Sequence, residues 1–336
     1  MFDFRSDTVT RPTKAMKEAM MNAEVGDDVY EDDPTIKALE LYVAQITGFE
    51  ASLFVLSGTM GNQLAVMSHT QKGEAVLMHA TVHVNQYEVG AIGLLSSAYP
   101  KLVYNETGYL SASDIIKYKG VDNIHFPKVS MVIVENALGD GRCLNSDIMN
   151  QTIQQAHDFG YKVHMDGARL FNAHIANQES LSSLIGNADS LMFCLSKGLG
   201  APVGSMLCGS KTFIAQARRY RKMLGGGIRQ GGILAAAGIY ALTHHVDRLK
   251  EDHERAAQIT KMLQDFKYEV KVNHRDINMV FFKLRDNQSE SDWIKRALDF
   301  DLIFSPSSHG WLRLVTHLDI NDEAVMRLHQ FLQSQK

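Results

Sequence analysis

The sequence has little cysteine and no long apolar run, and both absences exclude whole classes of protein. Its three cysteines, Cys143, Cys194 and Cys208, are too scattered for a disulfide framework and lack the paired spacing of a zinc site. We therefore expect no metal centre and a reducing, cytoplasmic location. No run approaches the roughly 20 apolar residues that span a bilayer. The N-terminal residues MFDFRSDTVT also lack the apolar region of a signal peptide.

An excess of charge of one sign is missing as well. The 336 residues carry a formal net charge of -4, which gives no reason to expect nucleic acid or a membrane as a partner. The remaining composition, 45% hydrophobic and 21% charged, is typical of a globular protein with a sizeable core. The length is typical of about two domains.

Helical and strand-like segments alternate along most of the chain. One helix is expected over residues 12–22, and a second has Asp33 as its N-cap and ends at Gly48. The strand-like runs are short apolar blocks, as in strands that are buried on both faces of a parallel sheet. They are residues 51–56, 75–79, 131–134, 162–165, 191–195 and 204–208. We therefore predict an α/β fold with helices on both faces of the sheet.

The pattern changes after about His245. A charged helix, two strands and a last helix follow, at residues 246–263, 279–284, 311–315 and from about 322. This order predicts a large domain over residues 1–245, with an N-terminal arm of about residues 1–20, and a small α+β domain over residues 246–336.

A turn of small residues, Ser57–Asn62, follows a buried strand and precedes a helix. Free N–H groups and the positive end of the helix dipole can bind an anion at such a place. The turn is neither a Walker loop nor a dinucleotide fingerprint. Taken alone, it is more simply interpreted as a plain tight turn.

A carboxylate and an amine are expected at the same edge of the sheet. Asp166 ends a buried strand, where it could pair with Arg169 and cap a helix, or hold a protonated heterocyclic nitrogen. Lys197 follows another apolar strand, with glycines after it and almost no charge nearby, so desolvation would make its amine nucleophilic toward carbonyl compounds. Pyridoxal phosphate needs an anion site, a carboxylate for its pyridine nitrogen and an imine-forming lysine. The three features together predict this cofactor.

A second cluster of glycines, residues 224–232, contains Arg229 and lies just after Lys222. It could be a flexible surface loop. It could also contact a phosphate, including that of a cofactor in a neighbouring subunit.

Six motifs spread over the chain carry a resemblance to a known family. They are RSDTVTRPT at 5–13, VGDDVYEDDPT at 25–35, HMDGARLFNA at 164–173, SKGLGAPVGS at 196–205, GGGIRQGGILAAAGIYAL at 225–242 and RLVTHLD at 313–319. In these motifs the sequence resembles the low-specificity L-threonine aldolases, which are fold-type-I pyridoxal-phosphate enzymes. The resemblance implies a mostly parallel seven-stranded sheet in the large domain. It also implies a homo-oligomer with shared active sites, at least a dimer and expected to be a tetramer.

The resemblance assigns cofactor contacts to particular residues. Lys197 would form the Schiff base, and Asp166 would bond the pyridine nitrogen. Gly58 and Thr59 would hold the phosphate, with Arg229 arriving from the partner subunit. His83, Arg169 and Lys222 are further expected cofactor contacts, His83 by stacking on the ring.

The same resemblance assigns residues to the substrate. His83 and His125 would serve the acid–base steps near the substrate hydroxyl. The expected contacts of the substrate carboxylate are Ser6, Arg169 and Arg313. Tyr30 is a further expected substrate contact, and it would line the site near the subunit interface together with Lys222.

The implied reaction is aldol cleavage of L-threonine, L-allo-threonine and related β-hydroxy amino acids to glycine and acetaldehyde or another aldehyde. One segment departs from the family, because members commonly read Glu-Asn-Thr-His where this chain has Glu135, Asn136, Ala137 and Leu138. The change keeps another reaction of the same cofactor open, such as racemisation, transamination or β-elimination. A non-catalytic homologue that binds the cofactor is the remote alternative.

Overall fold

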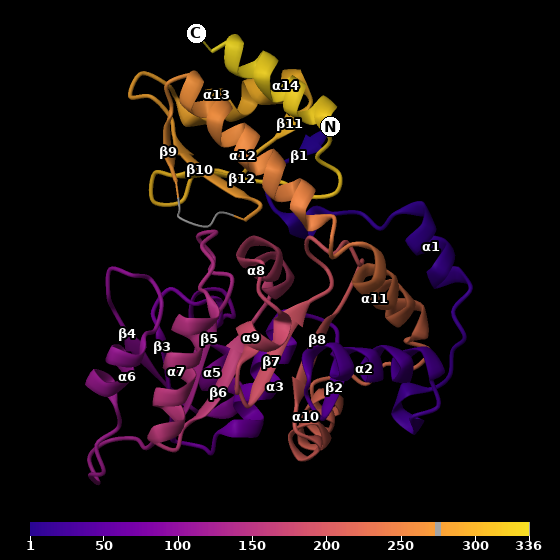
Figure 1. The fold of residues 1–336 in the computed structure, drawn as a ribbon, viewed down its shortest axis with the longest axis vertical. Helices are drawn as coiled ribbons and strands as arrows, with labels where there is room; N and C mark the ends of the chain where they lie inside the picture. The colour runs from indigo at the N-terminus through magenta and orange to yellow at the C-terminus, as the bar shows by residue number, and fades with distance from the viewer. Residues whose placement is uncertain (273–276, 336) are drawn as a thin grey trace.

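The computed structural model describes residues 1–272 and 277–335, and a seven-stranded sheet forms its centre (Figure 1). The strands lie in the order β2-β8-β7-β6-β5-β3-β4. They are β2 (Ala51–Val55), β3 (Ala75–His79), β4 (Tyr99–Val103), β5 (Val129–Glu135), β6 (Lys162–Asp166), β7 (Ser190–Cys194) and β8 (Ser205–Gly209). Only β8 runs antiparallel to its neighbours in this sheet, so the predicted mostly parallel α/β sheet is confirmed.

Both faces of the sheet are covered by helices. On β7, Leu191 and Phe193 lie in one core cluster, whereas Met192 and Cys194 lie in the other, as expected for side chains that alternate between two buried faces. One face packs against α3 (Gly58–His69), α5 (Ala91–Ser96) and α10 (Lys211–Met223). The other packs against α2 (Pro34–Thr47), α6 (Ala112–Tyr118), α7 (Ser146–Asp158), α9 (Leu181–Ile185) and α11 (Gly232–His244).

The predicted boundaries of α2 are confirmed. The Asp33 side chain accepts hydrogen bonds from the N–H groups of Thr35 and Ile36, and Gly48 ends the helix with a φ of 77°. The preceding helix, α1 (Lys14–Met21), is shorter than expected because Thr13, rather than a residue near 11, is its N-cap.

The C-terminal unit contains an antiparallel sheet of order β12-β10-β9, packed against helices, and lies at one end of the large sheet (Figure 1). Its elements are α12 (Leu249–Asp265), β9 (Glu269–Lys271), β10 (Met279–Lys283), α13 (Glu290–Ala297), β11 (Leu302–Ile303), β12 (Leu312–Val315) and α14 (Asp322–Gln333). The buried side chains of Phe282, Trp293 and Phe331 form the centre of its core.

The first residues of the chain return to this C-terminal unit. β1 (Phe2–Asp3) pairs in parallel with β11, and Phe4 is fully buried in the same core. The N-terminal arm, assigned to the large domain on sequence grounds, therefore packs in part on the small one; the division at residue 245 stays a prediction. Among the described residues, no helix has the length and apolar character required to cross a membrane.

Candidate active site

The predicted carboxylate and amine lie on neighbouring parallel strands. Asp166 is the last residue of β6, and Lys197 follows the end of β7 by three residues. Asp166 is 1% exposed and Lys197 is half-buried. Both lie at the carboxyl edge of the parallel strands, the edge where open α/β sheets bind ligands. A small cavity of about 10 Å³ is lined there by Arg169, Cys194 and Lys197.

Asp166 accepts hydrogen bonds from two neutral donors. Asn62 Nδ2 lies 2.9 Å from its Oδ2, and the N–H of Ala168 lies 3.1 Å from its Oδ1. Arg169 does not pair with it, so the simpler interpretation of Asp166 as the ion-pair partner of Arg169 is wrong. A buried carboxylate without a direct cationic partner among the described residues is costly unless a ligand supplies the positive charge.

The turn at residues 57–62 forms the N-terminus of α3 beside this carboxylate. Ser57 is the N-cap and accepts a hydrogen bond from the N–H of Met60. A Cβ atom on Gly58 would lie 3.0 Å from Cys194 Sγ, so the first turn of α3 packs against the end of β7. The free N–H groups at Gly58 and Thr59 therefore lie near the sheet edge that carries Lys197, as an anion site requires.

A half-buried histidine and two further buried carboxyl groups complete the site. His83 begins α4 (His83–Gln86), and its Nδ1 lies 3.0 Å from Glu88 Oε1. This hydrogen bond raises the pKa of His83, against the opposing effect of burial. The backbone N–H of His83 donates to Glu135, which is paired with Asp166 across β5 and β6. Burial, and then the charge of Asp166, raise the pKa of Glu135 to about 7.

The arginines expected at the substrate carboxylate lie around a buried aspartate. Arg169 donates to both carboxylate oxygens of Asp7. Its Nε lies 2.8 Å from Oδ2, and its Nη2 lies 2.6 Å from Oδ1. Burial acts to raise the pKa of Asp7, but Arg169 and Lys197 hold it well below its usual range. Burial and the proximity of Arg169 lower the pKa of Arg313, whose Nη2 donates to the carbonyl oxygen of Arg5. The cluster of Asp7, Arg169 and Arg313 therefore contains two guanidinium groups and one carboxylate. Ser6, next to Asp7, caps a short 3-10 helix with its side chain.

Within one chain, His125 lies away from this site, so its expected role beside His83 stays a prediction that a neighbouring subunit would have to fulfil. It lies on an exposed loop that leads into the start of β5, whereas the end of β5 lies beside Asp166. The seven residues of this strand span roughly 20 Å. The sequence motif around His125 could not reveal at which end of the strand it lies.

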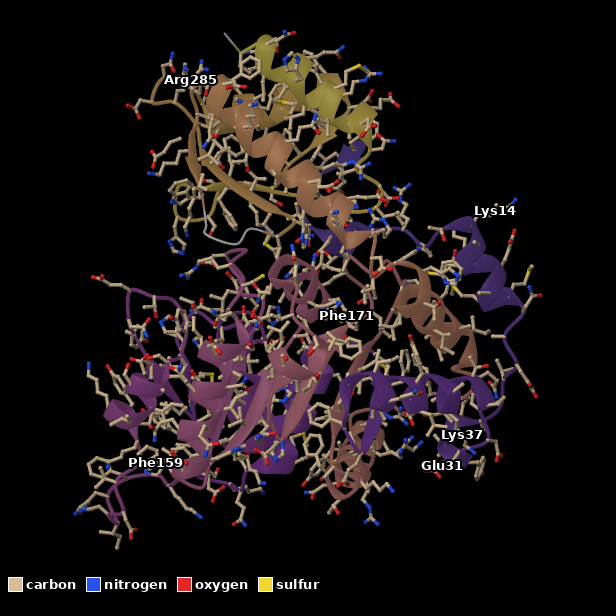
Figure 2. The ribbon with its side chains drawn as sticks, in the orientation of Figure 1. Lys14, Glu31, Lys37, Phe159, Phe171 and Arg285 are labelled. Atoms are coloured by element: carbon tan, nitrogen blue, oxygen red, sulfur yellow. The ribbon has the colours of Figure 1, made fainter. Side chains whose placement is uncertain are left out.

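The residues expected near a subunit interface are all exposed. Tyr30 is 75% exposed. Arg229 forms an ion pair with Asp27, with 2.9 Å between Arg229 Nη1 and Asp27 Oδ2. Lys222 lines a separate cavity of about 570 Å³ between α10 and the segment around Asp28. Figure 2 shows Glu31, the neighbour of Tyr30, well apart from Phe171 of α8 (Leu170–Asn177) at the site edge. The part that Tyr30, Lys222 and Arg229 play in the site stays a prediction.

Three residues of the site went unassigned on sequence grounds. The sequence pattern does not point to Asp7 or Glu88, and it places Asn62 only within the turn of residues 57–62. One local signal was available, because Asn62 lies one helical turn beyond Gly58 and so faces the same side of α3. His83, Glu88 and Asp166 also place possible metal ligand atoms within 4.8 Å of one another. Both carboxylates already accept hydrogen bonds from Asn62.

Comparison with known proteins decides the family. A family model described as beta-eliminating lyase matches residues 3–287. The chain belongs to this family. It is 41% identical over 325 residues to the low specificity L-threonine aldolase of Escherichia coli strain K12, covering 96% of each chain. It is 40% identical to low-specificity L-threonine aldolase 1 of Arabidopsis thaliana, covering 96% of this chain and 93% of that protein. The resemblance to the low-specificity L-threonine aldolases is thereby confirmed.

The fold of this beta-eliminating lyase family member is also that of a solved threonine aldolase. The structure from Leishmania major aligns with a TM-score of 0.83 at 19% identity, covering 99% of this chain and 98% of that one. The segment that departs from the aldolase pattern lies in the core, because Ala137 and Leu138 are 5% and 4% exposed and pack in the main hydrophobic cluster. The two apolar side chains are therefore accommodated by packing.

The residues at the sheet edge fit pyridoxal 5′-phosphate. The buried Asp166 carboxylate has no direct cationic partner among the described residues, which suits a protonated pyridine nitrogen. The half-buried Lys197 offers the amine, and the N-terminus of α3 offers the anion site.

Proposed function

We propose that this protein is a pyridoxal-phosphate-dependent threonine aldolase, a lyase that cleaves L-threonine and L-allo-threonine to glycine and acetaldehyde. Related β-hydroxy amino acids would yield glycine and other aldehydes. The observation that carries the proposal is the placement of Lys197 beside a buried Asp166 that has only neutral donors. The identity of 41% with the Escherichia coli aldolase over 96% of each chain supports the same substrate class.

The chain's own residues would hold the cofactor at three points. Lys197 would bind its carbonyl carbon, Asp166 its protonated pyridine nitrogen, and the N–H groups at Gly58 and Thr59 its phosphate. Bound in this way, pyridoxal phosphate supplies an electron sink at the substrate's α-carbon. Asp166 suits its task because both of its partners are donors, which favours the ionised carboxylate.

The substrate carboxylate would bind between Arg169 and Arg313, with the hydroxyl of Ser6 nearby. Asp7 occupies Nε and Nη2 of Arg169, which fixes the plane of the guanidinium group and leaves Nη1 for another anion. Fixing the carboxylate at one place determines which bond at the α-carbon is aligned for cleavage. This orientation would favour the Cα–Cβ bond over the Cα–H bond.

His83 would take the proton of the substrate's β-hydroxyl group. Its Nδ1 is bound to Glu88, so Nε2 is the nitrogen left for the substrate. The hydrogen bond that raises the pKa of His83 also makes it a better proton acceptor. A positioned base of this kind typically contributes about 10²–10⁴-fold to a rate.

The proposed unit is a cytoplasmic homo-oligomer, at least a dimer and expected to be a tetramer. Apolar side chains next to the site support an interface, since Tyr87 and Val89 are 70% and 97% exposed beside the buried Glu88. In the assembly, Arg229 would reach the cofactor phosphate of a neighbour, with Tyr30 and Lys222 near the shared boundary. Dilution to monomers should abolish activity, and fully active monomers would refute the shared site.

The direct test is product analysis with the cofactor-loaded protein and L-threonine or L-allo-threonine. We expect glycine and acetaldehyde in equal amounts, with acetaldehyde measured by a reductase that consumes NADH. Racemisation would instead yield D-amino acid, and β-elimination would yield a 2-oxo acid and ammonia. Either of these outcomes without acetaldehyde would refute aldol cleavage while keeping the cofactor.

A further inference from the structure

A chain of hydrogen bonds runs through the large unit and ends at Asp166. His69 Nε2 lies 2.9 Å from Ser190 Oγ, which lies 2.8 Å from His164 Nδ1. His164 Nε2 lies 3.0 Å from Asn62 Oδ1, and Asn62 Nδ2 lies 2.9 Å from Asp166 Oδ2. His164, Ser190 and Asn62 are completely buried. His164 and Ser190 have no role in the steps described above, and Asn62 entered them only as a donor to Asp166.

The fold explains why these residues meet. His164 precedes Asp166 by two residues on β6, so both side chains leave the same face of the sheet. Ser190 is directly opposite His164 on β7. Asn62 and His69 are seven residues apart on α3, about two turns, so they share the helix face that covers these strands.

The chemistry of the partners fixes the orientation of Asn62. Its Nδ2 lies 2.9 Å from Asp166 Oδ2 and 2.9 Å from Glu88 Oε1. Ionised carboxylates only accept hydrogen bonds, so both N–H groups of the amide point at them. Asn62 Oδ1 is then the acceptor that faces His164, and His164 Nε2 must carry a hydrogen.

The remaining hydrogens follow from the charge state of His164. Burial, and then the proximity of His69, lower the pKa of His164 to about 3, so its ring is neutral near pH 7. With the hydrogen on Nε2, Nδ1 is an acceptor and the Ser190 hydroxyl donates to it. His69 Nε2 then donates to Ser190 Oγ. Every donor in this chain of hydrogen bonds points toward Asp166.

We propose that Asn62 and His164 are positioning residues that hold the Asp166 carboxylate ionised and in one orientation for the pyridine nitrogen of the cofactor. The inference rests on the proposed cofactor. If His164 could not donate, Asn62 Oδ1 would be buried without a donor, which disfavours the orientation that the two carboxylates select, with both N–H groups toward them. A flipped amide would place an oxygen against two carboxylates, which disfavours their ionised forms. The pyridine nitrogen would then lose the negative charge that keeps it protonated.

The test uses holoenzyme reconstituted with pyridoxal 5′-phosphate carrying ¹⁵N in the ring, at neutral pH. The wild type should give the ¹⁵N signal of a protonated ring nitrogen. His164→Leu should shift the signal toward that of the neutral ring and weaken cofactor binding at least about tenfold, or about 1.4 kcal/mol. His164→Gln should restore both, because its side-chain amide can donate to Asn62 Oδ1 in place of Nε2. A merely structural role would not move the ¹⁵N signal.

A matched control is available in His79. It is 2% exposed, ends strand β3 of the same sheet, and its Nδ1 is hydrogen-bonded to Thr81, outside the hydrogen-bond chain that leads to Asp166. His79→Leu should leave the ¹⁵N signal unchanged, and a shift equal to that of His164→Leu would overturn the proposal. If His164→Leu does not fold, Ser190→Ala serves instead, because it removes the donor that keeps the hydrogen of His164 on Nε2.

Wild-type ¹⁵N signals in both His164→Leu and Ser190→Ala would overturn the inference alone. A wild-type protein that binds no pyridoxal phosphate would overturn the proposed function and this inference with it.

Discussion

Replacing Asp7 with Asn should cost the protein about 3–5 kcal/mol of unfolding free energy, the range for a buried ion pair that loses one partner. Asp7 is fully buried and accepts from Arg169 Nε and Nη2 and from the side-chain amide of Asn278. Asparagine has one acceptor oxygen instead of two. One of these donors would therefore face an NH₂ group, and Arg169 would lose its counter-ion.

The assay is urea unfolding followed by tryptophan fluorescence, at one protein concentration because association shifts apparent stability. The matched control is Asp3→Asn, which breaks an ion pair with Arg5 whose side chain is 48% exposed. We expect the control to change stability by only about 0–1 kcal/mol. Equal effects of the two substitutions would refute the reasoning that burial makes the Asp7–Arg169 pair important.

The pH dependence of this pair provides a second check. Arg169 holds the folded-state pKa of Asp7 below the unfolded value of about 4. The stabilisation is therefore present above about pH 4 and is lost as the pH falls through the folded pKa. The difference in stability between the wild type and Asp7→Asn should narrow in acid. A constant difference from neutral pH to about pH 2 would contradict the ion-pair explanation.

Three further predictions concern the site and the packing beneath it. Lys197→Ala should lose the imine absorbance of the bound cofactor and all acetaldehyde formation, and an unchanged spectrum would exclude Lys197 as the point of attachment. Glu88→Gln should lower the pKa of His83 and move the acid limb of the kcat/KM profile to lower pH, since the hydrogen bond to the carboxylate raises this pKa; an unmoved limb would argue against His83 as the base. Gly61→Ala should lower the unfolding free energy by about 1–3 kcal/mol, because the new Cβ would lie 2.7 Å from Met192 Cγ on β7. Gly93→Ala lies in another helix, where a Cβ would meet nothing within 4 Å, and should raise the unfolding free energy by about 0.5–1 kcal/mol. Urea midpoints that fall equally in both glycine variants would contradict the packing argument.

The parts of the fold that local chemistry determines could be predicted from the sequence. Asp33 and Gly48 fix the ends of α2 through a side-chain cap and a left-handed residue. Apolar blocks identified the buried strands because both faces of the sheet are covered. β4 was missed because it lies at the sheet edge and only Val103 among its residues is buried. β1 was missed because its two residues gain their strand partner from β11, about 300 residues further along the chain.

The active site, too, was predictable only where local sequence determines the position of a residue. Asp166 and Lys197 were predictable because Asp166 ends one apolar strand, Lys197 lies three residues after another, and parallel strands end at one edge. The pairing of Asp7 with Arg169 joins residues 162 positions apart, and no local pattern encodes it. The position of His125 could not be predicted because a motif specifies residue types but not the end of a strand at which they lie.

The central claim is that Lys197 carries the cofactor, and borohydride reduction of the loaded protein tests it most directly. Reduction fixes pyridoxal phosphate to the lysine that holds it, and peptide mass spectrometry then locates that lysine. We predict the added mass on the peptide that contains Lys197, and its absence from that peptide in Lys197→Ala. Added mass on the peptide that contains Lys222 instead, or on no peptide, would contradict the account.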